Sequence, residues 1–314
     1  MLALKISIAV IAFLLFSFLG ASLYVYFRCF GRVNKVKDFS DVKQIEEAGL
    51  GKFADIIQPA HVKVKALPHE DVYITSYDGL KLYAGLYSPE NEKGTIVLIH
   101  GWRSYGLNDF CGIVERYLSL GYSVLIPCQR ANTHSEGKFI CMGAKEKYDC
   151  KSWLEYLYAR FGEKHTIFLD GISMGGATVL MASGLDLPKS VKGIIADSGY
   201  TCAKDIVLSV AKKVNIYPYP LVWFVQFWFR VLGGCSMTKE TTIDAVKRNR
   251  LPILFIHGES DDFVPCEMTR RAYEAAICEK YIFTVPEAGH GQSYLYKTDE
   301  CYKLLVEFFE KYNR

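Results

Sequence analysis

The sequence predicts an α/β fold with a mostly parallel central sheet, helices on both faces, a small helical cap insert and one transmembrane helix in front. Along most of the chain, short apolar segments alternate with helical segments, which is typical of a parallel sheet covered on both faces. No charged residue occurs from Ile6 to Phe27, and a run of this length can cross a bilayer. Residues 171–175 read Gly-Ile-Ser-Met-Gly, which fits the G-x-S-x-G pattern of a sharp turn between a strand and a helix.

Residues 1–27 are predicted to form a single transmembrane anchor. The competing interpretation is a cleaved signal peptide, but its apolar region is usually about 7–15 residues long and ends in a small-x-small cleavage site, which is not evident in this segment. Tyr24 and Tyr26 stand where aromatic residues meet a membrane surface, and Arg28 and Arg32 follow them. These positive charges favour a domain inside the cell, whereas long domains cross membranes largely regardless of such charges. The charges therefore leave the side of the membrane open.

Residues 28–69 are predicted to be a mostly polar juxtamembrane segment with one helix near 41–49, and residues 70–314 to be one α/β domain. The pair Asp78-Gly79 predicts a hairpin turn between the first two strands. Apolar runs predict strands at 72–75, 80–87, 95–99, 123–126, 165–170, 191–196, 253–258 and 281–285. Helices are expected directly after the serine turn and over about 148–161 and 302–312.

Ser173 is the candidate nucleophile because it occupies the centre of the 171–175 turn. The turn forces unusual backbone angles on the serine and brings strand and helix close together, so glycines at both ends avoid a clash. A nucleophilic serine also needs a base that takes its proton and an acid that orients the base. A turn serine without chemistry is the alternative interpretation, and the residues that follow in the chain argue against it.

An acid and a histidine follow Ser173 in the order that such a site requires. Asp261 lies in the loop after the penultimate strand, and His290 lies in the loop after the last strand. Loops at the carboxyl ends of parallel strands meet at one edge of a sheet, so the three side chains are expected to meet there. Asp262 and Asp197 are alternative candidates for the acid, since each also follows a predicted strand.

Four local patterns, in this order, give the chain a resemblance to a known family. They are residues 99–102 (Ile-His-Gly-Trp) after a strand, the serine turn, residues 257–265 (HGESDDFVP) and residues 289–291 (Gly-His-Gly). From about residue 70 to residue 312, the chain resembles the α/β-hydrolase superfamily, specifically its serine-aminopeptidase-like or lysophospholipase-like esterase branch.

The resemblance implies a role for each candidate. Ser173 is implied as the nucleophile, His290 as the base and Asp261 as the acid, since the family places its acid four residues before the proline. The backbone N–H groups of Trp102 and Met174 are implied to form the oxyanion hole.

One pattern of the resemblance is incomplete. Relatives often carry D-x-R-G-H-G-x-S-x-G after the fourth strand, and residues 128–137 read CQRANTHSEG here. Arg130, Ser135 and Gly137 match this pattern, whereas the aspartate and the first histidine do not. In relatives this loop usually supports the site and does not react. The difference therefore does not affect the three candidate side chains, but it leaves the details of the substrate loop open.

Residues 214–234 interrupt the alternation of strands and helices and are rich in aromatic side chains. The segment lies where this family inserts its cap, at about residues 201–245. One interpretation is that Trp223, Phe224 and Phe227 form an apolar substrate pocket over the site. Ordinary packing of cap helices on the sheet is the alternative, and contact with the lipid surface stays open.

The predicted reaction is acyl transfer to water through Ser173, and it needs neither a metal nor an organic cofactor. No histidines and carboxylates have the spacing of a zinc site, and the scattered basic residues and net charge of +3 do not suggest nucleic acid as a partner.

The anchor and the apolar cap favour a small-molecule or lipid ester as the substrate, such as a lysophospholipid or a monoacylglycerol. The alternatives are a serine aminopeptidase-type peptidase, transfer of the acyl group to an acceptor other than water, and a non-catalytic membrane-tethered binding domain. The resemblance favours a single-pass membrane protein with its catalytic domain outside the cytoplasm, and the sequence leaves the oligomeric state undetermined.

Overall fold

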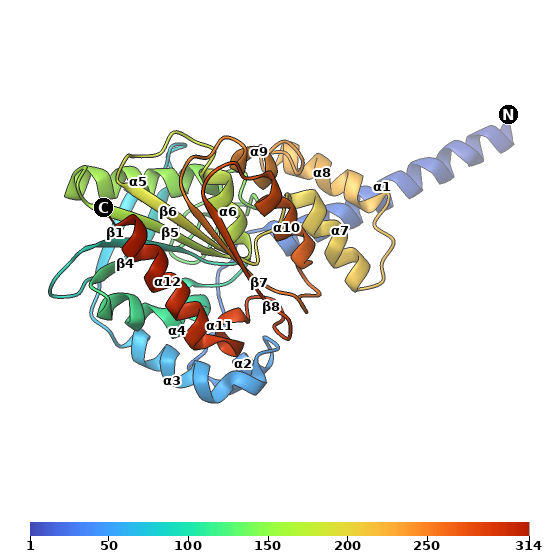
Figure 1. Ribbon diagram of the computed structural model, residues 1–314. Coiled ribbons are helices and arrows are strands. Elements are labelled where there is room, and N and C mark those ends of the chain that lie inside the picture. The colour runs from blue at the N-terminus through green and yellow to red at the C-terminus, as the bar shows by residue number, and fades with distance from the viewer. Residues whose placement is uncertain (314) are drawn as a thin grey trace.

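The computed structural model of the protein describes residues 1–313 and is built around one eight-stranded sheet (Figure 1). The strand order is β1-β2-β4-β3-β5-β6-β7-β8, and all pairs from β4 to β8 are parallel, whereas β2 is antiparallel to both β1 and β4. The strand bounds are β1 Glu70–Thr75, β2 Lys81–Tyr87, β3 Gly94–Ile99, β4 Tyr122–Pro127, β5 Thr166–Ile172, β6 Val191–Asp197, β7 Ile253–Gly258 and β8 Lys280–Val285. Each predicted strand has its counterpart, so the predicted fold class is confirmed.

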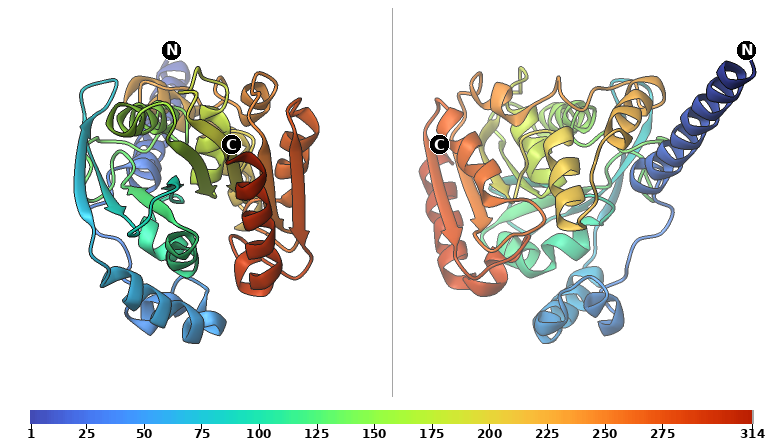
Figure 2. Two further views of the ribbon diagram at one scale, coloured as in Figure 1. Left: turned by 60° about the vertical axis from the view of Figure 1, so that its left-hand side comes forward. Right: turned by 90° about the vertical axis from the view of Figure 1, so that its right-hand side faces the viewer.

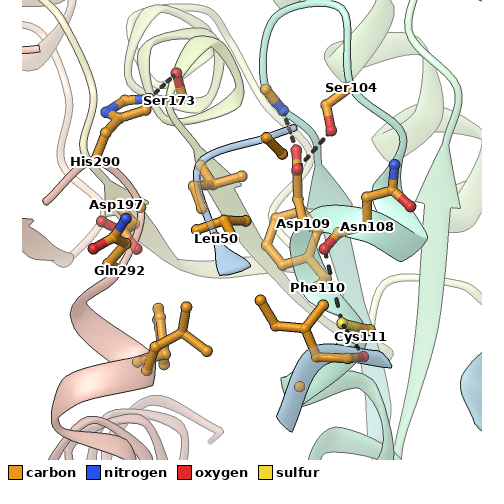
Figure 3. A pocket seen from close by; sticks show the side chains of 18 of the residues that line it. Leu50, Ser104, Asn108, Asp109, Phe110, Cys111, Ser173, Asp197, His290 and Gln292 are labelled. Atoms are coloured by element: carbon orange, nitrogen blue, oxygen red, sulfur yellow. Dashed lines mark hydrogen bonds between the residues drawn. The ribbon is translucent and has the colours of Figure 1, made fainter. Parts of the chain in front are cut away.

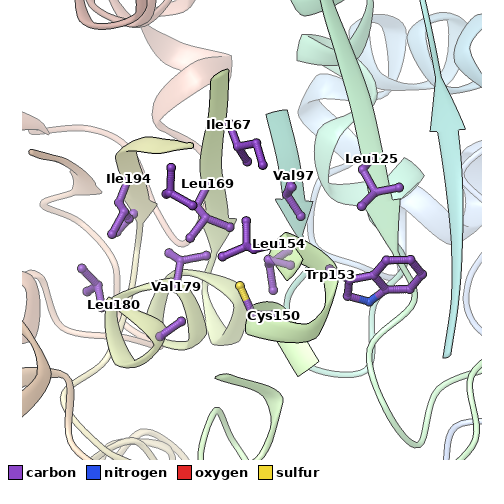
Figure 4. Close-up of a cluster of buried hydrophobic side chains, with 14 of the residues drawn as sticks. Val97, Leu125, Cys150, Trp153, Leu154, Ile167, Leu169, Val179, Leu180 and Ile194 are labelled. Atoms are coloured by element: carbon purple, nitrogen blue, oxygen red, sulfur yellow. The ribbon is translucent and has the colours of Figure 1, made fainter. Parts of the chain in front are cut away.

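Helices cover both faces of this sheet. One face packs against α5 (Glu146–Phe161), α6 (Met174–Ala182) and α10 (Cys266–Ala275), and the other packs against α4 (Gly106–Ser119) and α12 (Thr298–Tyr312). Successive residues of a strand point to opposite faces, so a strand buried on both sides is apolar throughout, as the sequence of β3 is. Figure 4 shows the first of these layers, in which side chains of α5 and α6 fill the space beneath β3, β4, β5 and β6.

The N-terminal helix α1 (Leu2–Phe30) projects away from the domain (Figures 1 and 2). It continues three residues past the predicted anchor, and only Ser22, Tyr26 and Phe30 are buried. These three positions are four residues apart and lie on one face of the helix, which packs against α8 (Leu221–Val231).

The juxtamembrane segment folds into α2 (Val42–Glu46), the 3₁₀ helix η1 (Gly51–Phe53) and α3 (Ala54–Lys65). The predicted helix near 41–49 corresponds to α2, whereas α3 was not predicted. This segment lies beside α4 and away from the contact between α1 and α8 (Figure 2). It therefore belongs to the wall of the domain.

The region between β6 and β7 contains α7 (Ala203–Lys213), α8 and the short α9 (Thr242–Val246). The short helix α11 (Ser293–Tyr296) lies between β8 and α12. The turns after β3, β5, β7 and β8 share one edge of the sheet, and these are the turns that hold the candidate site residues.

Candidate active site

Ser173 connects β5 to α6 by a sharp turn, as its sequence context predicts. Its φ of 57° and ψ of −116° lie in a region that side chains other than glycine rarely adopt, so the surrounding structure has to hold it there. A Cβ atom at position 171 would collide with the backbone of Gly175, and one at position 175 would collide with the carbonyl oxygen of Ile99. Only glycine fits at these two positions, which explains the motif physically.

The structure brings Ser173, His290 and Asp261 together at the edge of the sheet. His290 Nε2 lies 2.8 Å from Ser173 Oγ, and His290 Nδ1 lies 2.7 Å from Asp261 Oδ2 (Figure 3 shows the first contact). A carboxylate can only accept a hydrogen bond, so Nδ1–H donates to Asp261 and Nε2 is left to accept the proton of the serine hydroxyl. This chain of hydrogen bonds has the polarity that proton removal from Ser173 requires.

The environment of Asp261 keeps its carboxyl group ionised. Its Oδ1 atom accepts the backbone N–H groups of Phe263 at 2.9 Å and Val264 at 2.8 Å, and its Oδ2 atom also faces His257 Nε2 at 3.1 Å. Burial alone would raise the pKa of this carboxyl, but the hydrogen bonds from His257 and His290 hold the pKa well below its usual range. The sequence alone does not predict this contact between His257 and Asp261.

Neither of the two alternative acids forms a hydrogen bond with His290, which contacts Asp261 instead. The Asp262 side chain is 75% exposed and forms a 2.6 Å ion pair with Lys213. Asp197 is buried, its Oδ1 accepts the hydroxyl of Ser198 at 2.8 Å, and its Oδ2 has no hydrogen-bond partner within residues 1–313. Burial raises the pKa of Asp197 to about 6. The geometry therefore favours Asp261 as the partner of His290.

The loop after β3, which carries Trp102, lies against the serine turn. A Cβ atom on the neighbouring Gly101 would lie 3.4 Å from the Cβ of Ser173, which shows how closely the loop approaches. Within residues 1–313, the N–H groups of Trp102 and Met174 have no backbone acceptor. Met174 is the first residue of α6, where N–H groups have no partner inside the helix. Both groups are therefore available to an acceptor from outside the backbone.

Asp109 holds this loop in place, and sequence reasoning missed it. Its Oδ2 accepts the N–H of Gly101 at 2.7 Å, and its Oδ1 accepts the hydroxyl of Ser104 at 2.6 Å (Figure 3). On its other side, the loop is attached to the end of α1, since Trp102 Nε1–H donates to the carbonyl oxygen of Cys29 at 2.8 Å. The loop is therefore fixed from both α4 and the N-terminal helix.

The loop at residues 128–137 supports the site from behind. Arg130 forms ion pairs with Asp149 at 2.6 Å and with Asp78 at 2.9 Å. Gln129 occupies a variable position of the pattern, and its Nε2–H donates to the carbonyl oxygen of His100 at 2.6 Å. The loop thus braces the strand end that carries the Trp102 loop.

A cavity of about 720 Å³ opens at Ser173 and His290, and its volume lies within the range of about 300–1,000 Å³ usual for small-molecule sites (Figure 3). The predicted pocket residues Trp223, Phe224 and Phe227 do not line it. This is a correction to the sequence analysis, and the reason is that α8 turns toward α1. Phe224 stacks on Phe18 with ring centroids 6.4 Å apart, and Trp223 is 64% exposed.

The described part of the chain contains no evident set of side chains that could bind a metal ion. Within residues 1–313, no group of three or more His, Cys, Asp or Glu side chains is arranged to hold a metal ion. All ten cysteines are free thiols, and seven of them are buried. The chemistry described above involves only the serine, histidine and carboxylate groups.

Comparison with known proteins gives matches over most of the domain. Residues 94–230 match the family model described as alpha/beta hydrolase fold. The uncharacterized protein YqkD of Bacillus subtilis is 26% identical over 227 residues, which cover 72% of this chain and 74% of YqkD. The lysophosphatidylserine lipase ABHD12 of Macaca fascicularis is 26% identical over 207 residues, which cover 62% of this chain and half of the lipase.

Among solved structures, the esterase Pf2001 of Pyrococcus furiosus superposes with a TM-score of 0.66 at 22% sequence identity. The match covers 80% of this chain and 94% of the esterase. At this level of identity the likeness concerns the fold.

Proposed function

Because the chain belongs to the α/β-hydrolase superfamily, we propose that it is a membrane-anchored serine hydrolase that cleaves a carboxylic ester of acyl or lipid-like type. The observation that carries this proposal is the hydrogen-bonded series Ser173, His290 and Asp261 next to two N–H groups that can receive an oxyanion. Each of these groups meets one requirement of acyl transfer, and Ser173, His290 and Trp102 line one cavity.

In the proposed reaction, Ser173 Oγ attacks the ester carbonyl carbon while His290 Nε2 takes the hydroxyl proton. The negative charge on the carbonyl oxygen is stabilised by the N–H groups of Trp102 and Met174, each contributing roughly 3–4 kcal/mol where such donors have been measured. The bond to the alcohol oxygen then breaks, and His290 returns the proton to the leaving alcohol. Asp261 stabilises the transient imidazolium ion.

Water completes the cycle. It attacks the acyl-enzyme carbonyl while His290 Nε2 takes one of its protons, and collapse of the second tetrahedral intermediate breaks the bond to Ser173 Oγ. The carboxylic acid leaves and the serine hydroxyl recovers its proton from His290. The reaction balances with water as the only second substrate, so no redox partner or cofactor is required.

Membrane anchoring is supported by the length and exposure of α1. The uncharged stretch from Ile6 to Phe27 is about 33 Å long as a helix, and a bilayer hydrocarbon core is about 30 Å thick. None of the most apolar part of this helix is buried against the domain. We further propose that the domain lies outside the cytoplasm, on the resemblance alone, and protease protection in sealed vesicles tests that orientation.

The ester proposal is tested with a fluorophosphonate probe and p-nitrophenyl esters on the full chain in detergent. Wild type is expected to be labelled and to release p-nitrophenol, and the Ser173→Ala variant is expected to do neither, because it lacks the attacking oxygen. A folded wild-type protein that is not labelled would support a non-catalytic binding domain instead. Cleavage of an aminoacyl p-nitroanilide but of no ester would support a peptidase.

A further inference from the structure

The cavity at Ser173 does not extend beneath α8 but runs to the other side of the domain. Beyond the serine it continues between α4, α11 and the juxtamembrane segment (Figure 3). Near Ser173 its walls carry polar groups such as those of Ser104, Asp109 and Gln292. Farther along, the walls are supplied largely by the apolar side chains of Leu50, Ile56, Ile57, Phe110, Ile113 and Leu295. The cavity is thus polar at its reactive end and has a mainly apolar wall on the side of the juxtamembrane segment.

The juxtamembrane segment completes this cavity because it bridges the gap between α4 and α11. On the α4 side, Ile57 of α3 packs in a buried cluster with Cys111 of α4, and Lys63 forms a 2.7 Å ion pair with Glu115. On the α11 side, the ring of Phe53 contacts that of Tyr296 with centroids 5.4 Å apart. Contacts on both sides hold the segment in one position, so the cavity has a defined shape.

The direction of α4 gives the depth of this apolar part. Asp109 lies at the level of the serine turn, since it binds the Gly101 N–H, and the cavity still touches α4 at Arg116, two helical turns farther on. At 1.5 Å per residue, this distance along the helix is about 10 Å. A cavity of such depth with mainly apolar walls suits an extended hydrocarbon chain better than it suits a polar group.

We propose that the juxtamembrane segment forms the acyl-binding wall of the active site, so that Leu50 and its apolar neighbours set the chain length of the substrate. The occupant is the acyl chain of an ester whose carbonyl group lies between Ser173 and the N–H groups of Trp102 and Met174. This inference rests on the proposed function. It assigns the substrate-binding role that the sequence had suggested for α8 to a segment outside the predicted α/β domain.

The test uses the full chain with two alkyl fluorophosphonates, one short and one long. Leu50 is partly exposed and points into the cavity, so Leu50→Trp narrows the cavity with little change to the core (Figure 3). In this variant, the ratio of the long-probe rate to the short-probe rate is expected to fall at least tenfold below the wild-type ratio. Leu50→Ala, which leaves the cavity open, should react with the long probe at least as fast as wild type. With p-nitrophenyl esters, Leu50→Trp should again prefer shorter chains than wild type does.

Two comparisons keep the outcomes separate. Ile56 also lines the cavity and is 58% exposed, so Ile56→Trp provides a second narrowing variant if Leu50→Trp does not fold. Trp223→Ala is the matched control in α8 and should leave the preference for chain length unchanged. The inference is overturned if both narrowed variants keep the wild-type ratio of the long-probe rate to the short-probe rate, or if Trp223→Ala shifts the preference. Failure of wild type to react with the short probe would instead overturn the proposed function, and the inference with it.

Discussion

Replacing Asp261 with asparagine tests the proposed site most directly, because the surroundings of this side chain determine how the asparagine must lie. In wild type, Oδ1 accepts two backbone N–H groups, from Phe263 and Val264, and Oδ2 accepts the Nδ1–H of His290. Asparagine has only one oxygen, and the two backbone donors claim it because an NH₂ group there would face them directly. The new NH₂ group therefore faces His290.

This orientation reverses the polarity of the histidine. The NH₂ group of the introduced asparagine donates to Nδ1 of His290, so the ring proton moves to Nε2, which faces Ser173 Oγ at 2.8 Å. A protonated Nε2 cannot accept the serine proton, and the charge that stabilised the imidazolium ion is lost as well. The same replacement in a serine protease lowers kcat about 10⁴-fold, so we expect a loss on that order, equivalent to about 5 kcal/mol in the barrier.

The assay measures kcat/KM with a p-nitrophenyl ester and the rate of fluorophosphonate labelling, with thermal unfolding as a check on folding. Asp262→Asn is the matched control, since its exposed ion pair with Lys213 is worth less than about 1 kcal/mol. It should keep activity within about threefold of wild type. The reasoning is refuted if Asp261→Asn retains more than a tenth of wild-type kcat/KM in a folded protein, or if Asp262→Asn loses as much.

Three further outcomes are expected. Asp109→Asn should lower kcat roughly 10- to 100-fold with little effect on KM, measured by steady-state ester hydrolysis, because the Trp102 loop loses one of its two acceptors. Asp197→Asn should keep activity and raise the free energy of unfolding, measured by denaturant titration, by up to about 3 kcal/mol and more at pH 8 than at pH 5. The reason is that the pKa of Asp197 is about 6 in the folded state and about 4 in the unfolded state, so the stability of wild type falls as pH rises from about 4 through 6. Brominated lipids in vesicles should quench the fluorescence of the exposed Trp223 but not that of the buried Trp153. Quenching should therefore be lost in Trp223→Phe and should persist in Trp153→Phe.

The sheet and the three central side chains were predictable because each depends on local sequence or on one simple rule. Strands buried on both faces are mostly apolar, so β3, β5 and β7 stand out from their surroundings although β5 contains Asp170 and β7 contains His257. The glycines around Ser173 report a turn that no larger residue permits. Parallel strands then carry the following loops to one edge, which is why Asp261 and His290 could be assigned although 88 and 117 residues separate them from the serine.

The supporting residues could not be assigned in the same way. Asp109 is an acid in the first turn of α4, and such acids are common wherever a helix begins, because they interact favourably with the helix dipole. Asp109 can accept hydrogen bonds from Gly101 and Ser104 only because of the angle at which α4 meets the Trp102 loop. The sequence carries no signal for that angle.

The helix α3 is a different kind of miss, because its signal was present. Ala54, Ile57, His61 and Val64 are buried and recur at spacings of three and four residues, which is typical of an amphipathic helix. Pro59 within this stretch and the polar composition around it obscure the pattern, although five helical residues precede the proline. With α3 overlooked, the wall that it provides for the cavity was also invisible.

The aromatic helix α8 shows why an apolar stripe does not by itself identify a substrate pocket. An apolar stripe indicates only that one face of a helix is shielded from water. An active site, a neighbouring helix or a lipid surface can each provide that shielding. In this protein the partner is α1, since Phe229 packs on Phe30 with centroids 4.6 Å apart and Trp228 donates to Ser22 at 2.9 Å. These partners are about 200 residues apart in the chain. A window of sequence around α8 therefore contains no information that could assign its two faces. One face packs on α1, whereas the other carries the exposed Trp223 and is expected to meet lipid.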